Sequence, residues 1–352
     1  MKLDEAEVDA ALGALSSGWL TMGPRIQAFE AAAAERLGVT HALAVSSGTA
    51  ALHLACVAAG VRGGRNAVTS ALAGPEAAWA PRTSGGDAVV ADVSDVLVPV
   101  ADVLRAAVPG TAAVIASHLT GVPADAAALR AACDARGLVL IEDVTDALGA
   151  TLADGRPAGC AGHMGCFSLA DGRLGGVGEG GLVVTEDDEL AARVKSLRSH
   201  AMTSVTWDRH RGHADSYDIV DIGFNYRMDE PRAALATARL ERLEALTKER
   251  RAAAAEIRAA VPAGVTPAWP DGLPTGAAPQ AVALVASDEA RRDALAAALE
   301  AHDVAVGTWP GVFADAAPIA AEARARTVLI DLGAVETAGL GAATVARVVA
   351  GA

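Results

Sequence analysis

The chain has very little lysine. Only Lys2, Lys195 and Lys248 are lysines among its 29 basic Lys and Arg residues. The neutral amine of lysine is a nucleophile, whereas the guanidinium of arginine stays protonated in proteins and cannot replace it. An arginine at a position where the chemistry needs a lysine amine would therefore remove that chemistry.

Basic residues are scarce as a class. Against 43 acidic residues they give a formal net charge of −14, so the chain lacks a basic face that could neutralise a nucleic-acid backbone or an anionic membrane. No run of eighteen apolar residues occurs, and the first ten residues carry four acids and no apolar stretch. We therefore expect no membrane span, no secretion and a cytoplasmic location.

Metal-ligand patterns are also missing. The pair His210 and His213 has i, i+3 spacing, but Arg209 and Arg211 beside it oppose a cation, which favours a solvated loop. The cysteines form no C-x-x-C pair and are expected to be reduced thiols that pack as small apolar groups. These cysteines are Cys56, Cys133, Cys160 and Cys166. We expect no metal site.

What the chain does contain is an alternation of short apolar runs and helical patterns. Its 352 residues, 52% of them hydrophobic, suggest a large and a small domain. The alternation predicts an α/β fold with a largely parallel sheet covered on both faces, and ligands outside the carboxyl ends of the strands. The predicted strands are 42–45, 88–91, 114–116, 138–141, 166–168 and 182–184, and the predicted helices include 24–37, 103–108, 125–136 and 189–197.

A long helix and a proline-rich loop divide the chain. Apolar residues at helical spacing predict a helix from about 231 to 261, and the loop that follows, to Pro279, holds five prolines. We predict a large domain over 1–240 and a small C-terminal α+β domain over 241–352, with the long helix at the boundary.

Two motifs follow predicted strands in the first half of the chain. The segment 46–53, Ser-Ser-Gly-Thr-Ala-Ala-Leu-His, opens a helix, and its glycine allows backbone amides to approach an anion. The strand 138–143 ends in Glu142 and Asp143, which could either pair with a protonated pyridine nitrogen or cap a helix. His118 also follows a strand and could face a substrate or be satisfied by a loop.

Two further motifs lie before the long helix. The segment 165–181 has seven glycines in seventeen residues and includes Ser168 and Arg173, which indicates a backbone that bends around something. The second, 223–228, reads Gly-Phe-Asn-Tyr-Arg-Met and carries Asn225.

In order and spacing the four motifs resemble those of the DegT/StrS family of sugar aminotransferases. The resemblance implies the aspartate-aminotransferase fold (fold type I of the pyridoxal-phosphate, PLP, enzymes), a large mostly parallel-sheet domain and a homodimer. It also implies PLP-dependent amination of a keto-sugar, commonly nucleotide-linked. By motif, Gly48 and Thr49 match the phosphate-binding turn, Asp143 the partner of the pyridine nitrogen, Ser168 a phosphate ligand, and Asn225 a phosphate contact from the other subunit.

The departures from the family pattern centre on one residue. Arg173 lies five residues after Ser168 and five before Gly178, the family spacing of the Schiff-base lysine. The usual internal aldimine therefore cannot form, and the base that moves the proton during transamination is lost. Asp146 falls near the expected cofactor hydroxyl, and its negative charge would repel the phenolate form of that group. The segment 69–75 lacks the aromatic side chain that relatives place over the pyridine ring.

Three interpretations account for these departures. In the first, an ordinary aminotransferase carries a replaced lysine. In the second, a natural variant either holds PLP or pyridoxamine phosphate non-covalently or uses Arg173 to clamp another anionic substrate. In the third, a non-catalytic protein pairs with an active paralogue as a heterodimer. The partner expected in every case is a small molecule, with a keto-sugar or nucleotide sugar implied by the resemblance.

Overall fold

A seven-stranded sheet forms the centre of the computed structural model, which describes residues 3–93, 100–202, 218–310 and 317–352. The strand order is β1-β7-β6-β5-β4-β2-β3, and β7 runs antiparallel to both of its neighbours while the other strands are parallel to one another. The predicted α/β fold with a mostly parallel sheet is therefore confirmed. The strands are β1 (His41–Val45), β2 (Asn66–Ser70), β3 (Asp87–Ala91), β4 (Thr111–Ser117), β5 (Val139–Val144), β6 (Met164–Ser168) and β7 (Gly181–Thr185).

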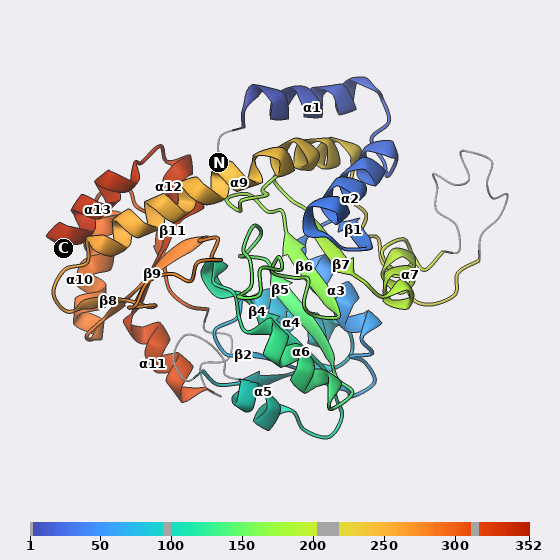
Figure 1. The fold of residues 1–352 in the computed structure, drawn as a ribbon, viewed down its shortest axis with the longest axis horizontal. Coiled ribbons are helices and arrows are strands. Elements are labelled where there is room, and N and C mark those ends of the chain that lie inside the picture. Colours follow the sequence, from blue (N-terminus) through green and yellow to red (C-terminus); the bar gives the residue numbers. More distant parts are fainter. Residues whose placement is uncertain (1–2, 94–99, 203–217, 311–316) are drawn as a thin grey trace.

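Helices cover both faces of this sheet (Figure 1). Successive strand residues point to opposite faces, so Val114 packs toward α5 and α6 whereas Ile115 packs toward α3 and α4. The helices of the large layer are α1 (Glu5–Ser16), α2 (Pro24–Leu37), α3 (Gly48–Ala58), α4 (Pro75–Thr83), α5 (Val100–Ala106), η1 (Leu119–Gly121), α6 (Ala126–Asp134) and α7 (Asp188–Leu197).

Local signals set several helix ends where the sequence predicts them. Helix α2 begins at Pro24, whose missing N–H is harmless in the first turn, and ends before Gly38 in the left-handed conformation at φ 67°. The long helix α9 (Glu230–Ala259) begins after Asp229, whose carboxylate accepts from the amide of Arg232. It ends just before Pro262, as predicted.

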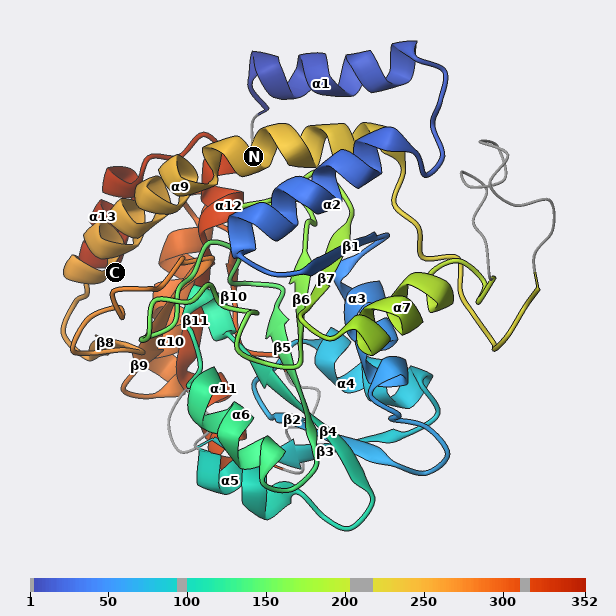
Figure 2. The ribbon, with the colours of Figure 1, turned by 45° about the vertical axis from the view of Figure 1, so that its right-hand side comes forward.

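The C-terminal part folds around a second sheet. Its four strands are antiparallel in the order β10-β11-β9-β8, and α9 runs from the layer of α1 and α2 to α13 beside this sheet (Figure 2). Its elements are β8 (Val265–Pro267), β9 (Ala281–Ala286), α10 (Glu289–Glu300), β10 (Val306–Gly307), α11 (Pro318–Arg326), β11 (Thr327–Asp331), α12 (Leu332–Thr337) and α13 (Ala342–Gly351).

Strand β2 and helix α1 are among the elements that were not predicted, and each has a physical reason. Strand β2 reads Asn-Ala-Val-Thr-Ser, which lacks a continuous apolar run. Helix α1 buries Glu7 and exposes Val8, Leu12 and Leu15, the reverse of the usual amphipathic pattern. In the part of the chain that the structure describes, no helix is both long enough and apolar enough to cross a membrane.

Candidate active site

The predicted site residues gather at one edge of the large sheet. Strands β1, β5 and β6 run in the same direction, so their carboxyl ends meet at this edge. Asp143 lies opposite Cys166 in the β5–β6 register, two residues before Ser168. The fourth motif joins them through Tyr226, whose carbonyl accepts from the amide of Ser46 at 2.8 Å and whose hydroxyl lies 3.0 Å from His53. The structure thus brings all four sequence motifs to one region.

Gly48, the first residue of α3, packs closely against Ser168 at the end of β6. A Cβ atom on Gly48 would come within 2.7 Å of the Ser168 Cβ and 3.1 Å of its Oγ, so only glycine fits without movement. The Ser47 hydroxyl accepts from the amide of Ala50 and caps the helix. The amides of Gly48 and Thr49 belong to the first turn, which has no intrahelical acceptors and favours an anion. Thr49 is exposed and Ser168 is nearly buried.

Asp143 is buried at the end of β5 and held in one orientation. One carboxylate oxygen accepts from the amide and the hydroxyl of Thr145, at 3.1 and 2.7 Å. The other accepts from the hydroxyl of Ser117 at 2.9 Å. An ionised carboxylate has about four acceptor sites, so one remains for a donor such as a protonated ring nitrogen.

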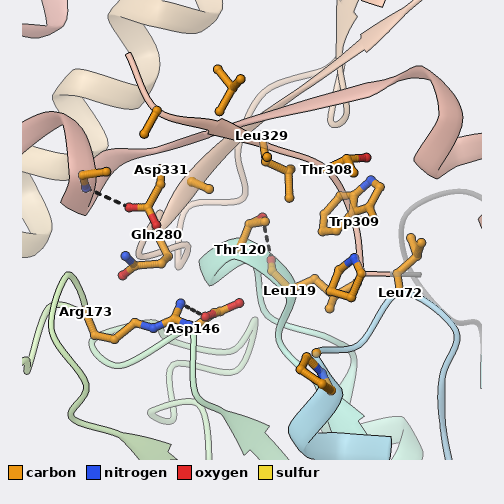
Figure 3. Close-up of a pocket in the computed structure, with 18 of the residues that line it drawn as sticks. Leu72, Leu119, Thr120, Asp146, Arg173, Gln280, Thr308, Trp309, Leu329 and Asp331 are labelled. Atoms are coloured by element: carbon orange, nitrogen blue, oxygen red, sulfur yellow. Dashed lines mark hydrogen bonds and ion pairs between the residues drawn. The ribbon is translucent and has the colours of Figure 1, made fainter. Parts of the chain in front are cut away.

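Arg173 forms an ion pair with Asp146, and both side chains are about one-third exposed (31% each) (Figure 3). Burial lowers the pKa of Arg173, while the charges of Asp331, Glu76 and Asp143 act in the opposite direction. The guanidinium remains protonated, so Arg173 can neither attack a carbonyl nor accept a proton. Asp146, predicted to lie near the cofactor, is therefore the counter-ion of Arg173.

A cavity of about 420 Å³ adjoins this ion pair, between the large sheet and the small one. Glu76, in the first turn of α4, lies on its wall and accepts a 3.4 Å hydrogen bond from Thr145. Burial, and then the charge of Asp143, raise the pKa of Glu76. No motif marks this acid in the sequence, because the segment 69–75, where relatives place an aromatic plate, ends one residue earlier.

Residues from the C-terminal half hold the backbone next to Arg173. The buried Arg250 donates to the carbonyl of Gly172 at 2.7 Å, and Gln280 donates to the same carbonyl at 2.8 Å. Arg250 also pairs with Glu336 at 2.8 and 3.0 Å. Gly333 packs so closely on Gly172 that a side chain there would collide with the backbone. Sequence reasoning missed this network, whose members lie far apart in the chain.

Glu142 and His118 lie apart from the cavity and have a structural role. The two side chains are fully buried and bonded at 2.9 Å, and the other ring nitrogen of His118 accepts from the amide of Ala124. Glu142 also accepts from the amides of Gly159, Ala161 and Gly162. Burial alone would raise its pKa, but the His118 and backbone hydrogen bonds lower it below the ordinary value. His118 is therefore satisfied by a loop and an acid.

Asn225 lies apart from the cavity. Its backbone pairs with that of Ser199, and its side chain is exposed. The two histidines considered as a metal pair, His210 and His213, lie outside the described residues. Over the ranges that are described, no group of three or more His, Cys, Asp or Glu side chains could hold a metal ion.

Comparisons with known proteins agree with the fold. A model described as the DegT/DnrJ/EryC1/StrS aminotransferase family matches residues 1–329. The aminotransferase TlmJ from Streptoalloteichus hindustanus is 27% identical, with a TM-score of 0.88 over 99% of this chain and 95% of its own. DesV of S. venezuelae, solved with a ketimine intermediate, is also 27% identical, with a TM-score of 0.84 over 98% and 93%.

A more distant structure shares the fold alone. It is a GDP-4-keto-6-deoxymannose-3-dehydratase with a trapped PLP-glutamate geminal diamine, 19% identical, with a TM-score of 0.84 over 99% of this chain and 98% of its own. The cofactor prediction, PLP or its pyridoxamine form, is in agreement with the matched aminotransferase family.

Proposed function

The chain belongs to the DegT/DnrJ/EryC1/StrS aminotransferase family, and from that premise we propose a keto-sugar enzyme that holds PLP or pyridoxamine phosphate without a covalent bond. The observation that carries the proposal is the Arg173–Asp146 ion pair, where a Schiff-base lysine is expected. An arginine introduced alone would stand among residues suited to lysine. Here Asp146 neutralises it, which favours a natural, remodelled site over a single replaced lysine.

The residues fit the cofactor at two of its three contact regions. At the phosphate end, the first-turn amides of Gly48 and Thr49 and the hydroxyl of Ser168 would hold the anion, in a turn too tight for any side chain on Gly48. At the ring nitrogen, Asp143 would accept a hydrogen bond at its remaining acceptor site. At the third region, where a Schiff-base lysine is expected, Arg173 supplies a positive charge instead of a neutral amine.

Side chains of this protein would supply the charges and the proton transfer that the reaction needs. When bound, the cofactor supplies an electron sink for bonds next to the substrate nitrogen. Asp143 would keep the ring nitrogen protonated, and Arg173 with Asp146 would supply paired charges at the position where a Schiff-base lysine is expected. Glu76, whose pKa is raised, is the group at this cavity best suited to give or take a proton in place of the lost lysine.

We further propose a homodimer in which Asn225 reaches the phosphate site of the partner subunit. Asn225 is exposed, and close to it in the chain Ile219, Val220 and Ile222 are 66%, 66% and 82% exposed. Such apolar exposure favours an interface. Light scattering of the purified chain should give twice the monomer mass. A monomer that doubles only with a lysine-containing paralogue would support the heterodimer interpretation instead.

The proposed function is tested with Arg173→Lys beside the wild type and Arg173→Met. The wild type should bind pyridoxamine phosphate, seen as a change in cofactor fluorescence, but show no Schiff-base absorbance with added PLP. Arg173→Lys should gain that absorbance and lose it again on addition of an amino donor. Arg173→Met should gain no Schiff-base absorbance. The proposal fails if Arg173→Lys stays colourless and none of the three proteins binds pyridoxamine phosphate.

A further inference from the structure

The cavity beside Arg173 is acidic. Its described lining residues include three carboxylates, those of Glu76, Asp146 and Asp331, and Arg173 is their single cation. The ion pair occupies Asp146 and Arg173 with each other. Two carboxylates, from Glu76 and Asp331, therefore remain to meet a ligand.

These two acids come from opposite sides of the cavity. Glu76 lies on α4 beside the large sheet. Asp331 ends β11 of the small sheet (Figure 3). One oxygen of Asp331 accepts from the amide of Ala334 at 3.0 Å and caps α12. The charges of Asp331 and Glu76 also oppose the lowering of the Arg173 pKa by burial, so the three groups interact electrostatically across the cavity.

The rest of the wall is largely apolar. Leu72, Leu119, Trp309 and Leu329 line it, and its volume of about 420 Å³ lies within the range of small-molecule sites. A ligand of this size with an apolar face and several hydroxyl groups would match the wall. A ring the size of one monosaccharide fits this description.

The acidic side chains of the cavity distinguish ligands by their charge. Carboxylate oxygens accept hydrogen bonds from hydroxyl groups and, more strongly, from ammonium groups. A phosphate or pyrophosphate here would meet the like charge of Asp331, and that of Glu76 when it is ionised, and the nearest guanidinium is already paired. The anion-binding turn at Gly48 and Ser168 is not part of this wall and would be filled by the cofactor's phosphate.

We propose that the cavity takes a neutral or amine-bearing polyol of monosaccharide size, and that it selects against phosphorylated and nucleotide-linked sugars. The inference rests on the proposed function, in which this cavity is the substrate site. Asp331 is the residue that prefers the amine, and Glu76 adds to that preference when it is ionised.

The test uses the full chain loaded with pyridoxamine phosphate and three probes that share one ring: glucose, glucosamine and UDP-glucose. Ligand-observed NMR titrations should show glucosamine binding about fivefold more tightly than glucose, the size expected of one partly exposed ion pair. UDP-glucose should bind at least roughly tenfold more weakly than glucose. Asp331→Asn, whose amide oxygen can still cap α12, should remove most of the preference for glucosamine over glucose.

A matched control removes a charge elsewhere. Asp293 on α10 has a side chain 69% exposed, so Asp293→Asn should leave the glucosamine preference unchanged. Tighter binding of UDP-glucose than of glucose, an unchanged preference in Asp331→Asn, or no binding of either glucose or glucosamine would each overturn the inference. Loss of pyridoxamine phosphate binding with the sugar preference intact would instead count against the proposed function alone.

Discussion

The two ends of the candidate site are built in different ways. Within one chain, the anion end, around Gly48 and Ser168, lies at the edge of the large sheet and is held by the close contact between these two residues. The acidic end, around Arg173, is assembled between the two sheets and depends on side chains from α9, α12 and the start of β9. The first end matches the family pattern and the second departs from it.

This difference teaches where such a site can change. The anion end admits almost no substitution at Gly48, because backbone and β-carbon atoms fill the space. At the acidic end one change can be balanced by another, as Asp146 balances Arg173. We therefore expect changes in reaction and substrate to arise from substitutions at the acidic end, while the anion end around Gly48 and Ser168 keeps its residues.

The largest effect should come from removing the hydrogen bonds that Arg250, in the second half of the chain, makes next to the acidic end. Arg250→Met removes a guanidinium that is 1% exposed and leaves Glu336 and Gln280 without their partner. We expect a loss of about 3 kcal/mol in the free energy of unfolding, measured with urea.

A neighbouring arginine gives the control. Arg251 is only half-buried, and its 2.7 Å bond goes to the carbonyl of Ala277, so Arg251→Met should cost about 1 kcal/mol or less. Equal losses in the two variants would show that the acidic end does not depend on Arg250.

At the anion end, Gly48→Ala should have the next largest effect. The added methyl group would lie 2.7 Å from the Cβ and 3.1 Å from the Cα of Ser168, so β6 or α3 must shift. We expect a cost of about 2 kcal/mol, with affinity for pyridoxamine phosphate reduced by about tenfold or more. Gly341→Ala, at a site with open space around the new atom, is the control. Undiminished cofactor affinity in Gly48→Ala would remove this turn from the cofactor site.

The Arg173–Asp146 pair should give a smaller and non-additive effect. Arg173→Gln leaves Asp146 facing the other acids of the cavity, and we expect a loss of about 1 kcal/mol for a partly exposed pair. Adding Asp146→Asn should recover most of that loss, and a double-mutant cycle by urea unfolding measures the coupling. If the two single losses simply add, the residues do not compensate each other.

The sequence predicted the fold well because its strands are short apolar runs between amphipathic helices. All six predicted strands and the long helix α9 are present. Helix α1 could not be predicted in the same way, because its buried residue is Glu7, which is held by Arg239 at 3.1 Å and Arg242 at 3.0 Å. Its apolar residues face outward, so hydrophobic periodicity gives no signal.

For the site, the sequence predicted residues that follow strands and missed those brought in by long-range packing. Gly48, Asp143 and Ser168 lie at one edge because the carboxyl ends of parallel strands meet there. Glu76 and Asp331 belong to no motif, and only the approach of the small sheet to the large one places them in the same cavity. The roles assigned to the cofactor-contacting residues stay predictions until cofactor binding is measured.

The pH dependence of stability at Glu76 tests the acidic end most directly. Burial and Asp143 raise the pKa of this carboxyl in the folded chain above the unfolded value of about 4.3. The folded state then binds the proton more tightly than the unfolded one. The contribution of Glu76 to stability is therefore full below the unfolded pKa and is lost as pH rises through the folded pKa.

Glu76→Gln has no proton to lose and should mimic the protonated acid. The variant should equal the wild type in unfolding free energy near pH 4 and exceed it at pH 8, by about 1.4 kcal/mol for each unit by which the pKa is raised. Urea unfolding across this range measures the difference, with the exposed Glu300→Gln as control. A difference that is flat with pH, or largest at pH 4, would mean that Glu76 is solvated like a surface acid. The cavity would then lack the proton donor assigned to it.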